Sequence, residues 1–433
     1  IAYIDDFEGS QDELRFSILK NAWGHASTPT RNGSRLSDSL TPKGRFTWYT
    51  PIERDRISLL QIQPNREDLT TDQSIIDIMR IRFQAARTNG FPRGSDNNNS
   101  GSPVNSWGGI MSNLDGWDLS RSKFLEIWVR GRDGKLHFDL GELSEQIDLP
   151  LDDPAHNPHP GKFRTEDQPL GGLPTGDGVA TAEEDIGLDG LTDAQEDSIF
   201  RQIFPNQTVP ADPSGDNFAD VDLSKSRDTE NHLRYPPGIN GTENNNAERV
   251  SIPNTEDLNS NGFLDTNNHY QRYSFNLFDD KGYNPETGAF DGPVVRVEGT
   301  ESDRIGGGAT NPPWRLIRIP LSGSRAPRAI EGSPDTTFAS PIDFVRFWVE
   351  SDQDIEISIF EPKAVGNDWL EDDPAISSLS GDFEVAAIGT SNPIYLSPPD
   401  LDLERDPITG LTLTERSLAL KFQDLFPGET RSA

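Results

Sequence analysis

The amino-acid sequence predicts a mainly β protein, a β-sandwich that carries a long loop-rich insertion and one or two short helices. Three observations support this prediction. Hydrophobic residues make up only 33% of the 433 residues, while 38 glycines and 33 prolines favour short strands joined by turns. Several short segments alternate large apolar residues with polar ones, which is the period of a half-buried strand. Between these segments lies a stretch dense in Asp, Asn, Gly and Pro.

The first region, residues 1–148, holds compact strand candidates separated by turns. The segment IIDIMRIRF (75–83) also fits a helix, but its β-branched residues and the Gly/Pro/Asn-rich stretch after it favour a strand. Each candidate places its apolar side chains on one face, which we expect to meet a core. The candidates are FTWYTPI (46–52), IIDIMRIRF (75–83), FLEIWVRG (124–131) and KLHFDLG (135–141).

Residues 149–270 show almost no alternation. We expect them to form the loop-rich insertion, either ordered around bound ions or disordered. Within the insertion, GLTDAQEDSIFRQIF predicts a short helix near 193–204. Thr192 is placed to cap the backbone, and Gln195 reaches back to it from three residues later. The apolar side of this helix is formed by Ile199, Ile203 and Phe204.

Residues 271–370 return to strand-like alternation, with RYSFNLF, WRLIRIPL, FVRFWVE and DIEISIFEPKAV. In FVRFWVE (344–350) both alternating sets of side chains are large, so we expect a central strand that is covered on both faces. The first domain is therefore predicted to span 1–373. A second β unit is predicted to begin near 374, and residues 374–433 are too short to complete a core of their own.

The composition excludes several classes of function. The net charge is −33, because 72 acidic residues outnumber 39 basic ones, and this charge repels nucleic acids and anionic membrane surfaces. Nucleic-acid binding is therefore not expected. The absence of cysteine removes disulfides, thiolate zinc sites and cysteine nucleophiles. No apolar run reaches the ~18 residues of a transmembrane helix. Because the chain starts at Ile1 without a signal-peptide pattern, we expect a piece of a longer protein.

No set of residues predicts catalysis, so we expect no enzyme and assign no catalytic or cofactor-binding residues. Glycosidases hold two carboxyl groups across a sugar, whereas the acidic pairs here are adjacent and would point to opposite faces of a strand. The histidines lack HExxH spacing, and Gly306–Gly308 lack the Lys and Ser/Thr of a phosphate loop. The acidic pairs are Asp5/Asp6, Glu183/Glu184 and Asp372/Asp373, and the histidines are His25, His137, His156, His159, His232 and His269.

One acidic motif has the spacing of a calcium loop. DLNSNGFLD (257–265) places Asp or Asn at positions one, three, five and nine, with glycine at position six for the sharp turn. The twelfth position is Asn268 instead of Glu, so we expect weak calcium binding of the extracellular type. Asx turns held by side-chain to backbone hydrogen bonds are the alternative. DPSGDNFAD (212–220) is a weaker copy of the motif. The predicted calcium ligands are the side chains of Asp257, Asn259, Asn261 and Asp265 and the carbonyl of Phe263.

An ordered series of short motifs carries a family resemblance. The motifs are YIDDFEGSQ, FTWYTPI, SWGGIM, FLEIWVRG, KLHFDLGELSEQID, IGLDGLTDAQED, DPSGDNF, INGTENN, DLNSNGFLDTNNHYQRYSFNL, FVRFWVE and SLALKFQDL. In this order they resemble the SprA/Sov family. Members of that family are very large bacterial proteins that form the outer-membrane translocon of the type IX secretion system, and they are also described as gliding-motility proteins of the cell surface.

The resemblance implies protein transport without covalent chemistry. A family member encloses a wide β-barrel through which folded cargo crosses the outer membrane, and it works with a PorV-like outer-membrane partner, a periplasmic plug protein and secreted cargo proteins. Membrane barrel strands of about 9–11 alternating residues are missing from this sequence. We therefore expect a jelly-roll-like domain inserted between barrel strands, outside the lipid and on the extracellular side of the outer membrane.

The opening motif YIDDFEGSQ is then expected to be architectural. An edge strand with Ile4 and Phe7 inward leaves its acidic side chains to solvent, to turn amides or to a structural cation. We expect this strand to pair with DIEISIF (354–360).

The alternative function is that of a secreted carbohydrate-binding jelly-roll module, in which exposed aromatic side chains stack on sugar. Eight Trp and seven Tyr permit this function. Most of the tryptophans, however, fall within alternating strand patterns, where they are expected to serve the core.

Overall fold

The computed structural model describes two large sheets, several small ones, one α-helix and the loops between them. The described residues are 2–4, 11–31, 34–35, 43–51, 57–62, 75–87, 101–131, 133–147, 163–167, 178, 186–203, 205–206, 208–209, 213–214, 216–217, 243, 253–277, 294–298, 304–305, 309–310, 313–321, 328–331, 341–367, 382–389 and 416–423.

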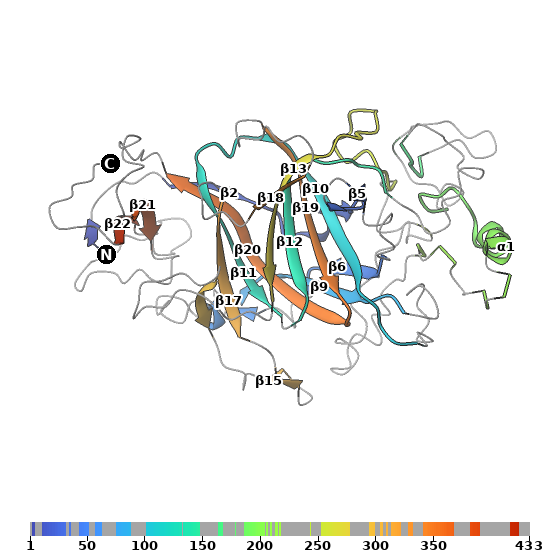
Figure 1. Cartoon of the computed structure of the whole chain (residues 1–433), viewed down its shortest axis with the longest axis horizontal. Helices are drawn as coiled ribbons and strands as arrows, with labels where there is room; N and C mark the ends of the chain where they lie inside the picture. The colour runs from blue at the N-terminus through green and yellow to red at the C-terminus, as the bar shows by residue number, and fades with distance from the viewer. Residues whose placement is uncertain are drawn as a thin grey trace.

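Two antiparallel sheets form the body of the protein (Figure 1). The six-stranded sheet has the order β18 (Arg328–Glu331), β13 (His269–Asn276), β12 (Lys135–Glu142), β19 (Ile342–Ser351), β10 (Ser106–Trp117) and β3 (Gly24–His25). The seven-stranded sheet has the order β14 (Val294–Glu298), β17 (Trp314–Pro320), β11 (Ser122–Arg130), β20 (Ile355–Asn367), β9 (Met79–Gln84) and β6 (Arg45–Tyr49), and β2 (Gln11–Arg15) also pairs with β20.

Eight of these strands follow the winding of a jelly roll. Four of them lie in the order β9-β20-β11-β17 in one sheet, and the other four lie in the order β10-β19-β12-β13 in the second sheet. This order arises when the chain passes between the sheets as two Greek keys. The predicted jelly-roll-like β-sandwich is confirmed. The segment 75–83, predicted as one strand, contributes two strands in different sheets, β8 (Ile75–Ile76) and β9, and no helix.

The main core lies between the two sheets and is built from alternate residues of the strands on both sides. Alternation directs every second side chain inward, so the eight jelly-roll strands each supply two or more apolar groups to this core. From the six-stranded sheet the core contains Ile110, Leu114, Leu136, Phe138, Leu140, Tyr273, Phe275, Val345, Phe347 and Val349. From the seven-stranded sheet it contains Phe46, Trp48, Met79, Ile81, Phe83, Leu125, Ile127, Val129, Ile317, Ile319, Ile355, Ile357 and Ile359.

Strand β19 is buried on both faces, as the sequence predicted. Val345, Phe347 and Val349 enter the core between the sheets, whereas Phe344 and Trp348 join a second apolar cluster on the outer face. Close approach of β10 to β19 explains the second glycine of SWGGIM, Gly109. A Cβ atom on Gly109 would lie 2.5 Å from Cβ of Trp348 and 2.6 Å from the carbonyl oxygen of Phe347.

The predicted helix is confirmed as α1 (Asp193–Ile203). Oε1 of Gln195 accepts a hydrogen bond from the backbone N of Thr192 at 2.9 Å, which is the expected return contact. Ile199 is buried, and Phe200 is buried beside it, although the sequence analysis did not assign Phe200 to the apolar side. Phe204 and the side chain of Ile203 lie outside the described residues. No helix in the described part of the chain is long and apolar enough to span a membrane.

The expected pairing of the chain start with 354–360 is wrong. β1 (Ala2–Ile4) pairs with β22 (Arg416–Gln423), and β22 also pairs with β21 (Asp382–Gly389). β2 pairs with the later part of β20, from Lys363 to Asn367. The physical reason is that β9 already occupies the same edge of β20 at Ile355–Ile359, so a second strand bonds only beyond it. Asp5, Asp6, Phe7 and Glu8 lie outside the described residues.

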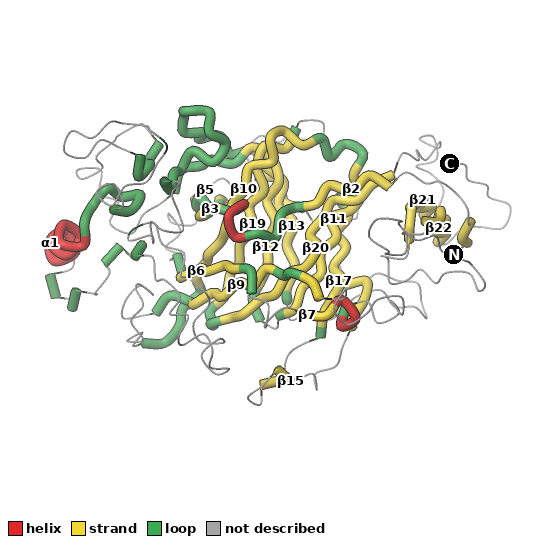
Figure 2. Tube along the Cα trace, turned by 180° about the vertical axis from the view of Figure 1, so that it is seen from behind, coloured by secondary structure: helices red, strands yellow, loops and turns green. Residues whose placement is uncertain are grey.

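The small sheet β1-β22-β21 lies at one end of the molecule and α1 at the other, as the view from behind also shows (Figure 2). The domain boundary near residue 373 stays a prediction. The other short elements are the strand pairs β4 (Thr30–Arg31) with β5 (Ser34–Arg35), β7 (Ile57–Ser58) with β8 (Ile75–Ile76) and β15 (Arg304–Ile305) with β16 (Ala309–Thr310), and 3₁₀ turns at Lys20–Ala22 and Leu59–Gln61.

Candidate functional site

The predicted calcium loop 257–265 is ordered, and its four predicted side-chain ligands lie together. Oδ2 of Asp265 accepts hydrogen bonds from Nδ2 of Asn259 at 2.7 Å and from Nδ2 of Asn261 at 3.1 Å. Asp257 accepts from the backbone N of Asn261 at 3.0 Å and of Gly262 at 2.8 Å. These contacts are those of the Asx-turn alternative, and calcium binding by the same groups stays a prediction.

Phe263, the fifth predicted ligand, lies at the tip of this loop. Its side chain is 73% exposed, and its backbone N donates to Oδ1 of Asn261 at 2.7 Å. Gly262 has φ of +81°, which a residue with a Cβ rarely adopts, so the glycine at position six is required by the turn. Phe263 thus lies within the turn, and the role of its carbonyl as a calcium ligand stays a prediction.

Glu145 is central to this loop, and the sequence analysis missed it. Its side chain is 1% exposed and accepts hydrogen bonds from the backbone N of Leu258 at 2.8 Å and of Asp265 at 3.1 Å. Its own backbone N donates to the carbonyl of Asp265 at 2.8 Å. Burial raises the pKa of Glu145 to about 7. The carboxylate therefore ties the loop to the segment that follows β12.

A repeated tripeptide joins this loop to a second segment of the insertion. Thr-Glu-Asp occurs at 165–167 and again at 255–257, and Thr165 and Thr255 form an antiparallel bridge. The contacts are reciprocal. Oε2 of Glu166 accepts from the backbone N of Asn254 at 2.7 Å, and Oε2 of Glu256 accepts from the backbone N of Arg164 at 2.8 Å. Both glutamates are buried, so each replaces water as the acceptor for a buried amide.

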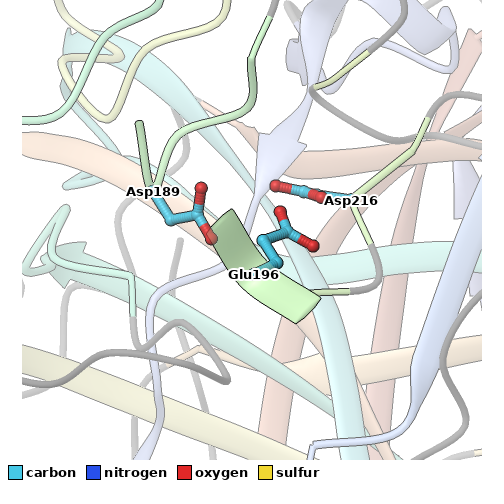
Figure 3. A group of neighbouring side chains, drawn as sticks. All are labelled: Asp189, Glu196 and Asp216. Atoms are coloured by element: carbon cyan, nitrogen blue, oxygen red, sulfur yellow. The ribbon is translucent and has the colours of Figure 1, made fainter. Parts of the chain in front are cut away.

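A second carboxylate cluster lies beside α1 (Figure 3). Asp189, Glu196 and Asp216 each offer an oxygen, and these oxygens lie within 4.8 Å of one another. Asp189 and Glu196 are buried, and Asp216 is half-buried. Ser214 links the two buried carboxylates, because its hydroxyl donates to Oδ2 of Asp189 at 2.7 Å and its backbone N donates to Oε2 of Glu196 at 3.0 Å. Asp216 falls within the weaker motif 212–220, but the sequence analysis did not predict that it lies beside Asp189 and Glu196.

A buried ionic network covers the outer face of the six-stranded sheet. The carboxylate of Asp139 accepts from Nε of Arg272 at 2.7 Å, from Nη2 of Arg346 at 2.7 Å and from Nε1 of Trp348 at 3.1 Å. Both guanidinium groups also bond to the segment that covers this face. Arg272 donates to the carbonyl of Thr30 at 2.6 Å, and Arg346 donates to Oγ of Ser27 at 3.0 Å. Although desolvation raises the pKa of Asp139, the two arginines outweigh it and hold that pKa below its usual value.

His137 lies next to this network on the same face. Its ring stacks on Trp348 with centroids 3.8 Å apart, and Nδ1 lies 2.7 Å from Oγ of Ser274. Nε2 is 3.8 Å from Oε2 of Glu350, which is longer than a hydrogen bond. Burial lowers the pKa of His137 to about 4. Because His137 and Ser274 are cross-strand neighbours in register, their contact follows from strand pairing.

Of the other candidate residues, His25 is half-buried, and its pKa is lowered to about 3 by desolvation and by Lys43 and Lys20. Its ring meets Trp48 edge to face. His269 begins β13 and is half-buried. Those outside the described residues are His156, His159, His232, Glu183, Glu184, Gly306, Gly307, Gly308, Asp372 and Asp373.

The tryptophan side chains of the described residues are mainly buried in the interior. Among seven described tryptophans, only Trp117 is half-buried, and it packs against Phe16 with ring centroids 5.4 Å apart. The prediction that most tryptophans belong to the core is therefore confirmed. The buried tryptophans are Trp23, Trp48, Trp107, Trp128, Trp314 and Trp348.

No protein-family model matches the chain, and none of the curated proteins matches it.

Proposed function

We propose that this chain is a non-catalytic, extramembrane jelly-roll domain of a type IX secretion outer-membrane translocon, where it supports protein export and gliding motility. The ordered series of motifs that resembles the SprA/Sov family carries the proposal. The sandwich supports it, because a jelly roll closes its own core and is suited to insertion between strands of a larger protein. The proposed partners are a PorV-like outer-membrane protein, a periplasmic plug protein and secreted cargo proteins.

The alternative, a carbohydrate-binding module, shares the jelly-roll fold. Sugar binding of this kind uses exposed aromatic rings that stack on the sugar. Among the described residues the large exposed hydrophobic side chains are Leu19, Ile75 and Phe263, and only Phe263 is aromatic. This burial of aromatic rings weighs against the alternative and in favour of a structural domain.

The buried polar groups support a structural role in the same way. Asp139 and Arg346 have no exposed side-chain surface, and Arg272 has 6%, so they are sealed beneath the covering segment around Thr30. Charged groups that bind a ligand need an approach from solvent, whereas these bond to one another and to backbone carbonyls. We assign this network to the fold and not to recognition.

Disruption of the gene in the source organism tests the proposal. We expect proteins that are normally secreted to accumulate in the periplasm and colony spreading to stop, and the intact gene supplied in trans to restore both. If the strain with the disrupted gene secretes and spreads normally but no longer binds a polysaccharide, the proposal is contradicted and the carbohydrate-binding module is favoured.

A further inference from the structure

The outer face of the seven-stranded sheet carries a row of polar side chains that runs across neighbouring strands. The residue before each member of the row in the sequence enters the core between the sheets, so the members point away from that core. All of them are buried, with between 6% and 8% of their surface exposed. The row consists of Tyr49 on β6, Arg80 on β9, Ser358 on β20 and Arg130 on β11, each in register with the next.

Arg80 is a buried charge that no carboxylate pairs with in the described part of the chain. Its Nε is a buried donor without an acceptor, and its guanidinium donates to the hydroxyl of Tyr49. Arg272 and Arg346, which are similarly buried, share the carboxylate of Asp139. Because removing a charge from water is costly, buried charges in proteins are paired and hydrogen-bonded. The free Nε of Arg80 therefore indicates an anionic acceptor.

Two hydroxyl groups beside Arg80 add further donors. The phenol oxygen of Tyr49 accepts from Arg80, so its own proton can be donated to a second group, and burial raises the pKa of Tyr49, which keeps the phenol protonated. Ser358 stands directly opposite Arg80, and side chains in such cross-strand pairs begin only about 4.5–5.5 Å apart. A guanidinium flanked by two hydroxyl groups is a set of donors suited to an oxyanion.

The adjacent row on the same face is open to solvent. Arg82 and Glu356 stand opposite each other, two residues along their strands from Arg80 and Ser358, so alternation places all four side chains on one face. Glu356 is exposed and Arg82 is half-buried. A ligand therefore has an approach to Arg80 from this side, which the sealed network around Asp139 lacks.

We propose that Arg80, together with the hydroxyl groups of Tyr49 and Ser358, binds a carboxylate ligand. The planar guanidinium presents Nε and one Nη in parallel, which matches the two oxygens of a carboxylate. A single negative charge is favoured over a phosphate dianion, because Glu356 lies on the same face and the net charge of the chain is −33. Arg130, which makes other interactions, adds positive charge on the far side of Ser358.

Saturation-transfer NMR of the whole chain with acetate as the probe tests this proposal, at constant ionic strength with chloride as the balancing anion. We expect wild-type acetate binding with a Kd of about 1–10 mM, as befits so small a ligand. R80M should weaken binding by about tenfold or more, and S358A by about two- to tenfold. The control R318M makes the same change on the same face, where Glu126 already accepts from Arg318, and should stay within about twofold of the wild type.

Thermal unfolding of R80M separates ligand binding from a structural role. In chloride buffer the variant replaces a buried charge that lacks a carboxylate by an apolar side chain, so its melting temperature should equal or exceed that of the wild type. Replacing about 100 mM chloride by acetate should raise the melting temperature of the wild type by about 2–4 °C and leave that of R80M unchanged.

Three results would overturn the proposal. The first is an acetate affinity that R80M leaves unchanged, or no acetate binding by the wild type at about 100 mM. The second is a marked loss of stability or of folding in R80M in chloride buffer, because it would show that the fold itself already satisfies Arg80. The third is binding of inorganic phosphate, and not of acetate, that R80M abolishes, which would make the ligand a phosphate.

Discussion

Replacement of Asp139 by Asn removes the single carboxylate at the centre of the buried ionic network. Asp139 has no exposed side-chain surface and receives hydrogen bonds from Arg272, Arg346 and Trp348. In D139N the amide keeps the shape of the carboxylate but turns an NH₂ group toward guanidinium donors. Two buried arginines then remain with no anion between them. Breaking a buried ion pair by removing one partner costs about 3–5 kcal/mol.

The magnitude translates into a readily measured thermal shift. Since the entropy of unfolding grows with chain length, a loss of 1 kcal/mol lowers the melting temperature of a domain of about 370 residues by about 1.3 °C, so D139N should melt about 4–7 °C below the wild type. The control is D115N, the same chemical change at the exposed turn of β10, where Asp115 bonds to Asn113. Asn tolerates the φ of +51° at this position, so the control should stay within about 0.5 kcal/mol of the wild type.

Differential scanning calorimetry of the full chain measures both variants. A D139N shift no larger than that of D115N would show that the buried ion pairs do not stabilise the fold as expected, since it would mean that the arginines find solvent or other acceptors when the carboxylate is lost. A large shift in D139N that R346M largely reverses in the double variant would support a stabilising role, because the second change removes one of the stranded charges.

Three further predictions follow from the same contacts. Millimolar calcium should raise the melting temperature of the wild type relative to chelator, and Asp257→Ala with Asp265→Ala should reduce that difference; equal melting temperatures in all four conditions would leave the loop an Asx turn. The pKa of His137 is about 4 in the folded state and 6.5 in the unfolded state, so its contribution to the free energy of unfolding is fully present above pH 6.5 and falls by up to about 3 kcal/mol toward pH 4. The urea midpoint of H137Q should therefore depend less on pH across this range than that of the wild type. An equal pH dependence in both proteins would argue against a buried neutral imidazole. A panel of polysaccharides and esters should show no sustained turnover, and turnover lost on changing one carboxylate would contradict the non-catalytic assignment.

The strands with strong alternation were predictable from sequence because each has to bury one face. In FVRFWVE both sets of side chains are large, and β19 is buried on both faces. α1 was predictable from Gln195, whose side chain accepts a hydrogen bond from the backbone N of Thr192, because the two residues lie close in sequence. Local patterns of this kind contain the information that fixes these elements.

Contacts between distant segments were not predictable in the same way. Glu145 meets Leu258 and Asp265 more than a hundred residues later, and no spacing in the sequence indicates that pairing. The chain start was expected on β20 at 354–360, but alternation does not say which edge is already taken by β9. Asp216 reaches Asp189 and Glu196 only through the path of the insertion, and the sequence analysis did not predict that these three residues meet.

The most direct measurement of the central claim is purification of the full-length parent protein from the source organism through a tag placed by genome editing. The proposal predicts that the tagged protein is recovered from the outer-membrane fraction together with a PorV-like partner and with cargo proteins in transit. Addition of protease to intact cells should also cleave a site engineered into the exposed turn at Asp115. Recovery of the tagged protein from the culture medium, without these partners and bound to polysaccharide, would contradict the account.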